Sequence, residues 1–309
     1  MPFIKRIYFL LILLSVFNCK KAVENTSELV EYSEYPETEQ LKAKQPLSQE
    51  FKDYWYAGEA EITSFKLEQA RYGELREGTA VLVYVTEDFL PKEQVKADTY
   101  SKSNIPILKL NATKNFNTGI YPYSIMQSIF YPVNNNQHAI KISTSVQEWC
   151  GHAYTQLNNR DTFEINSHSY FQGEADQNFK LNKSITENEL WTQLRIDPTS
   201  LPIGTLDILP SLEYIRLRHK TLKTYKAIAT LEDGIYTLSY PDLDRVLKIE
   251  FNTEFPYDIQ TWEETMPSGF GASTTYLTTK ATRMESLKSA YWGKNKNKDS
   301  ILRKTLRLD

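Results

Sequence analysis

Short segments in which apolar and polar residues alternate, separated by turn residues, make up most of this sequence. The clearest case is Tyr225–Leu231, followed by Glu232-Asp233-Gly234, Ile235–Tyr240 and, beyond a further turn, Arg245–Phe251. Alternation places apolar side chains on one face of a strand, and an Asp-Gly pair is typical of a tight hairpin. The pattern predicts antiparallel strands that follow one another along the chain, and it disfavours parallel βαβ units.

The same alternation recurs over most of the chain after residue 50. We therefore expect a mainly β fold, α+β at most. Its antiparallel, meandering sheets would curve into an incompletely closed barrel or form two β-rich halves, 51–183 and 199–290. The further predicted strands are Glu59–Tyr72, Thr79–Thr86, Ile105–Ala112, Ile120–Val133, Leu212–Leu217, Tyr257–Glu263 and Thr274–Arg283.

One helix is expected, near residues 186–196. Thr186 and Glu189 have the spacing of a capping box, in which each side chain bonds the other residue's backbone N–H. Asp197 precedes Pro198, and the residue before a proline disfavours helical geometry, so the helix should end there. This helix would separate two β-rich halves or cover one end of a single sheet.

The first residues have the pattern of a secretory signal. Lys5 and Arg6 precede the apolar run Ile7–Phe17, which is shorter than the roughly 20 residues needed to span a bilayer. The sequence Ser15–Cys19 resembles the lipobox of bacterial lipoproteins, in which the cysteine is acylated and becomes the mature N-terminus. That resemblance implies a signal peptide over residues 1–18 and acyl chains, palmitate among them, on Cys19.

An acylated Cys19 would make the membrane a partner of this protein, since two or more acyl chains anchor a protein stably. Lys20 occupies the position at which an aspartate would resemble an inner-membrane retention signal, so the resemblance implies the outer membrane, facing the periplasm or the cell surface. Residues 19–50 would hold the lipidated cysteine and a flexible acidic tether, because few apolar groups are available there to form a core. Residues 51–290 would form the β-rich domain, and 291–309 a basic tail.

Composition excludes several classes of function. A net charge of -3 gives no reason to expect a nucleic-acid partner. With Cys19 acylated, Cys150 has no second cysteine with which to form a disulfide. No phosphate-binding loop, GxSxG element or zinc-ligand spacing is present. We therefore expect no cofactor, and nothing in the sequence identifies an enzyme.

The segment His138–Phe171 carries the candidate site. If Val146–Leu157 is one strand, a three- or five-residue turn around Asn159-Arg160 sets His152 opposite His168 and Cys150 opposite Tyr170. Trp149, Ile165 and Phe171 would then face the core. The polar face of this hairpin would carry Glu148, Cys150, His152, His168 and Tyr170.

Two interpretations of that polar face stay open. It could be a metal site or a cysteine–histidine nucleophile. It could also be a partly buried thiol among hydrogen-bonded histidines, without chemistry. Same-face neighbours in a strand lie about 6.5–7 Å apart, so Cys150 and His152 could not bond directly without a bulge.

The stretches Tyr54–Glu59, Gln147–His152 and Gln156–Arg160 resemble a family of uncharacterised lipoproteins from Gram-negative bacteria. Some members of that family are described as septum formation inhibitors. That description belongs to cytoplasmic nucleotide pyrophosphatases with a Ser-x-Ser-Pro-Arg-Arg signature and an α/β fold, and this chain has no Ser-Pro dipeptide. The resemblance therefore implies location and architecture but no functional residues.

The leading functional hypothesis is a lipid-anchored envelope protein that binds a hydrophobic ligand or an envelope protein through a β-sheet scaffold. The aromatic content of 13% would suit an apolar concavity. The first alternative is an envelope enzyme or metal-binding protein that uses Cys150, His152 and His168. The second is an interaction scaffold without a pocket.

Overall fold

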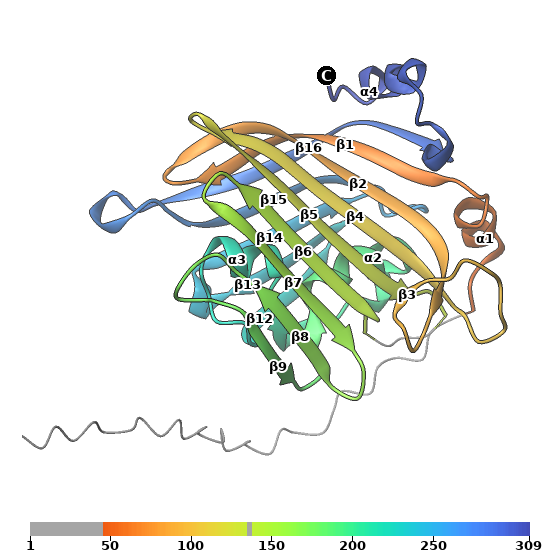
Figure 1. Cartoon of the computed structure of the whole chain (residues 1–309), viewed down its shortest axis with the longest axis horizontal. Coiled ribbons are helices and arrows are strands. Elements are labelled where there is room, and N and C mark those ends of the chain that lie inside the picture. The colour runs from red at the N-terminus through yellow and green to blue at the C-terminus, as the bar shows by residue number, and fades with distance from the viewer. Residues whose placement is uncertain (1–45, 135–137) are drawn as a thin grey trace, which may run out of the picture. The chain divides into compact units, whose positions relative to one another are not determined.

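A single large β-sheet organises the part of the chain that the computed structural model describes, residues 46–134 and 138–309 (Figure 1). Cys19 and the residues around it lie outside that part. The strands are β1 Ala60–Arg71, β2 Glu74–Leu90, β3 Val95–Lys96, β4 Ile105–Thr118, β5 Tyr121–Pro132, β6 Lys141–Glu148, β7 Gly151–Asn159, β8 Phe163–His168, β9 Gln177–Leu181, β10 Ile185–Thr186, β11 Gly204–Leu209, β12 Tyr225–Glu232, β13 Ile235–Tyr240, β14 Arg245–Phe251, β15 Ile259–Ser268 and β16 Thr275–Ser289.

Helices are few and short. The α-helices are α1 Gln49–Trp55, α2 Glu187–Ile196, α3 Leu212–Leu217 and α4 Ile301–Thr305, and 3-10 turns cover Pro198–Ser200, Pro241–Leu243, Gly271–Ser273, Tyr291–Gly293 and Asn297–Ser300. None of the helices in the described ranges is long and apolar enough to cross a membrane.

The sheet is a meander whose two ends come close together. Its order is β10-β11-β12-β13-β14-β15-β16-β1-β2-β4-β5-β6-β7-β8-β9, with β3 paired to β2. Among the described strands, only β10 and β11 run parallel. The edge strands β9 and β10 are separated by residues 182–184 alone, which can span at most about 14 Å between Leu181 and Ile185. No described strand pairing joins these two edges. The sheet therefore curls into an incompletely closed barrel, which confirms the predicted fold class.

Alternate side chains of the strands face the interior of the curled sheet. In β13 and β14 every second residue is buried, and the two strands meet in register from Ile235 opposite Glu250 to Tyr240 opposite Arg245. The turn between β12 and β13 lies at Asp233 and Gly234, both of which have positive φ, the geometry of a tight hairpin. Strands of both predicted halves belong to this one sheet.

Helix α2 lies on the concave side of the sheet. The predicted capping box is present, with the Thr186 hydroxyl accepting from the Glu189 N–H and the Glu189 carboxylate accepting from the Thr186 N–H. The helix contacts β4, β5 and β10, and its buried residues include charged ones. Because polar and apolar sides are both covered, α2 fills the interior of the curled sheet.

Arg195 fixes the far end of α2 to the sheet. Its two terminal nitrogens each donate to one oxygen of Glu61 at 2.7 Å, and its Nε donates to the Pro256 carbonyl at 3.0 Å. Both side chains are 2% exposed. Burial alone would raise the pKa of Glu61, but the charge and hydrogen bonds of Arg195 hold that pKa below its ordinary value.

One predicted strand is different in the structure. Leu212–Leu217 is helix α3 and not a strand, because Ser211 caps it by accepting from the Tyr214 N–H and its apolar side is buried against the sheet interior. The basic segment 291–309 contains α4 and two 3-10 turns.

The central hairpin also differs. Val146–Leu157 is two strands, since the chain reverses at Trp149 and Cys150 and Gln147 pairs with His152. The next turn has three residues, 160–162, and sets Tyr154, not His152, opposite His168. This register is two residues from the predicted one, so the paired residues of β7 and β8 keep their predicted faces while their partners change. Ile165 faces the core as expected, whereas Trp149 is 68% exposed on the turn.

Candidate functional site

The residues of the predicted polar site lie on the outside of the curled sheet. His152, His168 and Tyr170 are exposed, and Cys150 lies exposed on the β6–β7 turn. Tyr170 packs over Gly151, and His168 reaches Asp176 at 3.4 Å. These side chains therefore lie away from the interior of the curled sheet.

The environment of Cys150 favours the thiol over the thiolate. Its backbone N–H donates to the Glu148 carboxylate at 2.7 Å, and a hydrogen bond and the negative charge from the same carboxylate raise the pKa of the thiol. A reactive cysteine needs the opposite environment, one that lowers this pKa. Within residues 46–134 and 138–309, no group of three or more His, Cys, Asp or Glu side chains could hold a metal ion.

Polar side chains interrupt the inner face of the sheet in several neighbouring strands. In β4, Leu108, Leu110 and Phe116 face the core, and Lys114 belongs to the same alternate row. Charged groups in such a row are costly unless they are paired. The corresponding polar residues in β1, β5, β14 and β15 are Gln69, Gln127, Arg245 and Glu264.

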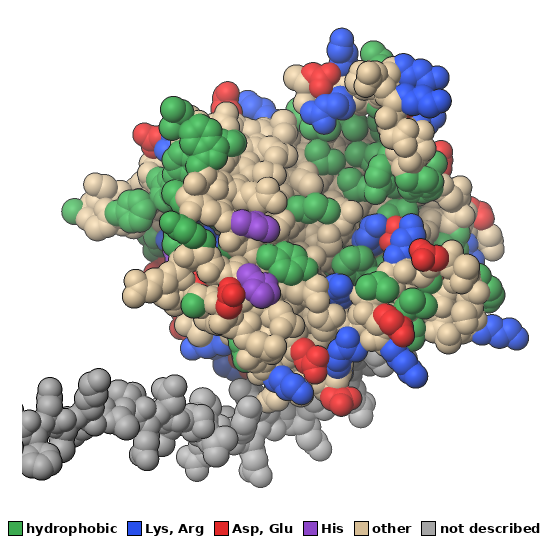
Figure 2. Space-filling view, viewed as in Figure 1, with side chains coloured by type: hydrophobic (Ala, Val, Ile, Leu, Met, Phe, Trp, Pro, Cys, Tyr) green, Lys and Arg blue, Asp and Glu red, His purple; other side chains and the backbone are tan. Residues whose placement is uncertain are grey.

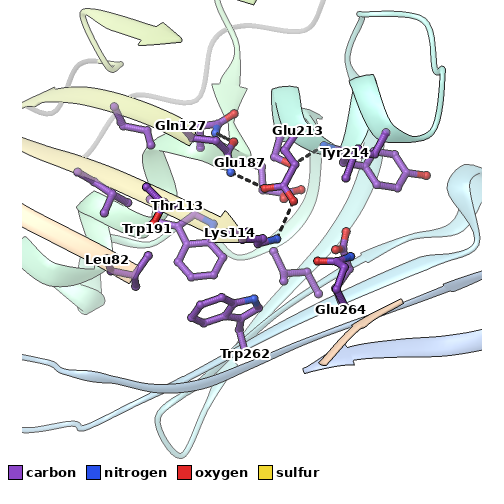
Figure 3. A pocket seen from close by; sticks show the side chains of 18 of the residues that line it. Leu82, Thr113, Lys114, Gln127, Glu187, Trp191, Glu213, Tyr214, Trp262 and Glu264 are labelled. Atoms are coloured by element: carbon purple, nitrogen blue, oxygen red, sulfur yellow. Dashed lines mark hydrogen bonds and ion pairs between the residues drawn. The ribbon is translucent and has the colours of Figure 1, made fainter. Parts of the chain in front are cut away.

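These residues line a cavity between the sheet, α2 and α3 (Figure 3). The cavity holds about 60 Å³, more than the roughly 10–15 Å³ that one water needs and far less than the roughly 300–1,000 Å³ of a typical small-molecule site. One wall is apolar and aromatic. It includes Leu82, Leu110, Ile129, Trp191, Leu247, Trp262 and Met266.

Lys114 and Glu213 form one half of the polar wall. Lys114 Nζ donates to Glu213 Oε1 at 2.7 Å, and Gln127 Nε2 donates to Glu213 Oε2 at 2.7 Å. Asn188 of α2 extends the chain of bonds, donating to Gln127 Oε1 and accepting from the Leu212 N–H. Burial alone would lower the pKa of Lys114, but the charge of Glu213 raises it, so the ammonium form is retained.

Arg245 organises the other half of that wall. Its terminal nitrogens donate to both oxygens of Glu187, and its Nε donates to Glu264 Oε1 at 2.6 Å. Tyr240 donates to Glu187 at 2.8 Å. Burial would raise the pKa of Glu264, but the charges of Arg245 and Lys114 hold it below its ordinary value. Glu264 is therefore a carboxylate at neutral pH.

One buried acceptor in the cavity wall lacks a partner. Gln69 is 1% exposed, and its Nε2 donates to Thr279 and to the Ala70 carbonyl, while its Oε1 has no hydrogen bond. A buried, unpaired acceptor costs about 1–3 kcal/mol, and a donor supplied by a bound molecule would remove that cost. The charged side chains of the lining are three cations, Lys114, Arg218 and Arg245, and three carboxylates, Glu187, Glu213 and Glu264.

The sequence shows that these residues lie on alternating apolar rows, but it does not show their partners. Lys114 and Glu264 each continue an alternating apolar row, two residues and one residue past the predicted ends of their strands. A charged residue on the apolar row of a strand is a candidate interior site whenever the strand continues beyond it. His138 lies in the segment predicted to carry the site, whereas its partner Glu189 was predicted only as part of the capping box.

His138 links the loop before β6 to the cap of α2. Its Nδ1 lies 2.9 Å from Glu189 Oε1, and the Ala139 N–H donates to Glu189 Oε2 at 2.8 Å. Burial would lower the pKa of His138, but the charge and hydrogen bond of Glu189 raise it. The contact therefore favours the protonated imidazole.

Replacing His138 with glutamine should remove a pH-dependent part of the stability. Since the folded-state pKa of His138 is raised, its contribution is fully present below about pH 6.5 and is lost as the pH rises through that higher pKa. We expect the variant to be about 1–2 kcal/mol less stable at low pH and closer to wild type at high pH. Urea unfolding across pH 5.5–9 measures this. His168→Gln, on an exposed histidine, is the control, and equal pH profiles for wild type and His138→Gln would contradict it.

Fold and site together define a class of protein: an incompletely closed β-barrel with a helix in its interior and a partly polar cavity beside that helix. No protein-family model and no curated protein matches the chain. Among solved structures, a beta-barrel-like protein of a domain of unknown function from Brucella abortus is similar, with 6% identity, a TM-score of 0.42, and coverage of 74% of this chain and 97% of that chain. A porin-like protein from Bacteroides uniformis matches with 8% identity, a TM-score of 0.20, and coverage of 74% and 96%. These likenesses are too distant to carry a functional argument.

Proposed function

We propose that this protein is a lipid-anchored protein of the cell envelope that binds an amphipathic small molecule in the cavity beside α2. The single observation that carries the binding proposal is the unpaired Oε1 of Gln69, which is buried in the wall of a cavity. The lipid anchor rests on Cys19 and the apolar run before it.

The lining specifies the chemistry of the ligand. Trp191 and Trp262 lie edge to face with centroids 5.3 Å apart, an apolar surface for a flat or aliphatic group. Gln69 and Glu264 offer acceptors, so the polar end of the ligand should carry a hydroxyl or amino group as donor.

The volume sets the size of the bound group. About 60 Å³ accepts only the end of a molecule. The remainder would lie over the residues of the α3 segment that border the cavity, Tyr214, Leu217 and Arg218. We therefore propose end-on binding, in which the donor-bearing terminus enters and the rest of the ligand stays outside.

Native mass spectrometry of the protein purified gently from the cells that produce it tests this proposal. Gln69→Leu removes the unpaired acceptor, and Met266→Trp fills the cavity. Gln147→Leu makes the same chemical change as Gln69→Leu, at an exposed strand position. We expect a bound small molecule on wild type and Gln147→Leu, and at least tenfold lower occupancy in both cavity variants. Wild type without a bound mass, or equal occupancy in the two Gln→Leu variants, would overturn the proposal.

A further inference from the structure

Five hairpins turn at the same end of the curled sheet, and each carries an exposed apolar side chain. They are the turns that join β15 to β16, β1 to β2, β4 to β5, β6 to β7 and β8 to β9, which are successive neighbours in the strand order. Figure 2 shows hydrophobic side chains gathered over that end, at the upper left. The residues at the tips, here called the apolar rim, are Phe270, Tyr72, Ile120, Trp149 and Tyr170.

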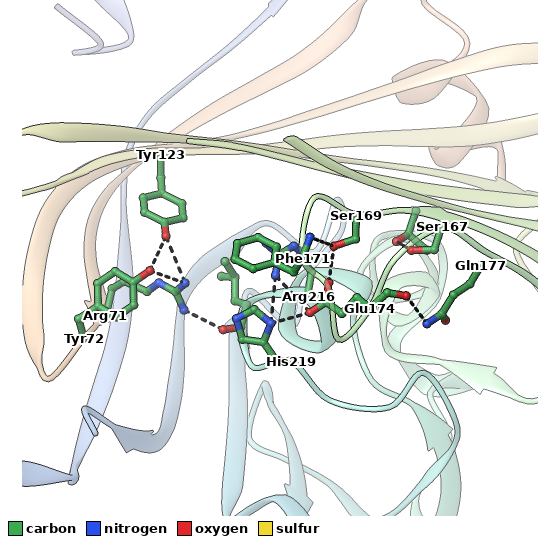
Figure 4. Close-up of polar contacts among 12 residues, drawn as sticks. Arg71, Tyr72, Tyr123, Ser167, Ser169, Phe171, Glu174, Gln177, Arg216 and His219 are labelled. Carbon is green, nitrogen blue, oxygen red and sulfur yellow. Dashed lines mark hydrogen bonds and ion pairs between the residues drawn. The ribbon is translucent and has the colours of Figure 1, made fainter. Parts of the chain in front are cut away.

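The rim is exposed and held in place. Ile120, Trp149 and Phe270 are 83%, 68% and 73% exposed. Phe270 stacks on Tyr72 at 5.7 Å, so neighbouring tips contact each other. Tyr72 in turn shares hydrogen bonds with Arg71 and Tyr123 (Figure 4). Monomeric proteins seldom expose an apolar surface of this kind unless something covers it.

Basic residues lie beside the rim. The end of α3 and the connection from α3 to β12 reach the same end of the sheet, and Arg71 of β1 donates to the carbonyl of Leu217, the last residue of α3, at 2.7 Å. Glu174 of the β8–β9 loop binds His219 of the connection at 2.5 Å and Arg216 of α3 at 3.4 Å (Figure 4). Among the described residues, Arg218, Lys220 and Lys223 form no ion pair, and they are here called the basic loop.

Aromatic tips beside unpaired cations match the surface of an anionic bilayer. Tryptophan and tyrosine favour the level of the lipid headgroups, and lysine and arginine are attracted to anionic lipids. A protein partner would need an acidic face that complements the basic loop. An anionic bilayer supplies both an apolar layer for the rim and negative charge for the basic loop. The neighbouring β13–β14 turn, at the same end of the sheet, carries the acidic Asp242 and Asp244 and none of the apolar tips.

The proposed lipid anchor would allow the apolar rim to reach the membrane. The described chain starts beside α1, at the opposite end of β1 from the rim (Figure 1). β1 has 12 residues and is about 40 Å long. The chain from Cys19 to Pro46 can reach at most about 95 Å, more than twice that length. The rim can therefore touch the membrane that holds the acyl chains.

We infer that the apolar rim and the basic loop dock the barrel end-on against an anionic lipid surface. The rim side chains enter the headgroup layer, and the basic loop lies over the phosphates. This inference uses the proposed lipid anchor only for reach, and it is independent of any ligand in the cavity. Its consequence is that the connection bordering the cavity, which includes Arg218, faces the bilayer.

Vesicle binding tests the inference without the anchor. The chain from Lys20 to Asp309 is sedimented with vesicles of phosphatidylethanolamine alone or with 30% phosphatidylglycerol. Wild type should bind the anionic vesicles, and less at high salt. Trp149→Ser with Phe270→Ser should lower the partition coefficient at least about tenfold on both vesicles. Lys220→Glu with Lys223→Glu should lower it by about tenfold on anionic vesicles only.

A matched control lies in the loop between β3 and β4, at the other end of the barrel. Tyr100 is 79% exposed and Lys102 is exposed beside it, so Tyr100→Ser with Lys102→Glu makes one change of each kind, aromatic to serine and lysine to glutamate, away from the rim. This variant should bind as wild type does, and circular dichroism checks that all variants are folded. Wild type that ignores anionic vesicles, self-associates instead, or binds as weakly as the rim variants would overturn the inference. So would equal losses in the rim and control variants.

Discussion

Replacing Arg195 with methionine is expected to lower the free energy of unfolding by about 3–5 kcal/mol, because it leaves the buried carboxylate of Glu61 without its partner. Both side chains are 2% exposed and share two hydrogen bonds of 2.7 Å. Arg195 also lies over the Tyr84 ring at 4.7 Å, so packing is lost as well. The change should loosen α2 from the sheet.

Urea unfolding followed by circular dichroism measures the effect. Glu61→Leu combined with Arg195→Met removes both charges, and since apolar replacement of a buried pair is often neutral, it should regain at least half of the loss. Arg303→Met is the control, because Arg303 pairs with Asp309 at 3.0 Å on the surface and should matter by less than about 1 kcal/mol. A loss from Arg195→Met no larger than that of Arg303→Met would contradict the role given to this pair.

Replacing Cys19 with alanine is expected to remove the acyl chains and to move most of the protein from salt-washed membranes into the soluble fraction. Each buried CH₂ group of an acyl chain contributes about 0.8 kcal/mol, far more in total than a rim of single side chains. The salt wash screens the contribution of the basic loop. Fractionation after the wash measures the release.

The mass of the N-terminal peptide is measured in parallel. This mass shows whether any protein that stays on the membrane is held there by an apolar signal segment that was not cleaved. In wild type the peptide should begin at Cys19 and be heavier by the acyl chains. A wild-type peptide without added mass, and with unchanged membrane retention in Cys19→Ala, would exclude the anchor.

The sequence predicted an element correctly where the contacts that stabilise the element lie within it. The Asp233-Gly234 turn and the alternation on either side predicted β13 and β14 with the observed bounds. The capping box predicted α2 to within one residue, because Thr186 and Glu189 satisfy each other's backbone N–H groups.

The β6–β7 turn and helix α3 were not predicted, because their sequences lack the local pattern of a common turn or helix. Trp149 and Cys150 lack the asparagine or glycine of common hairpins, and the Glu148 carboxylate instead satisfies the Cys150 N–H. Helix α3 has only six residues, too short for its period to differ from that of a strand.

The cavity could not be predicted, because its charges are paired over long distances in the chain. Lys114 and Glu213 are 99 positions apart, and Arg245 and Glu187 are 58 apart. Without knowledge of these partners, a charged residue on an apolar row indicates the end of a strand. The exposed hairpin was predicted to carry the site instead, because histidine and cysteine can act as nucleophiles or metal ligands.

The most direct test of ligand binding in the cavity is a crystal structure of the protein purified from the cells that produce it. The account predicts electron density larger than water between Trp191 and Trp262, with a donor atom within about 3.2 Å of Gln69 Oε1. A cavity that contains only water molecules bonded to Gln69 and Glu264 would contradict it.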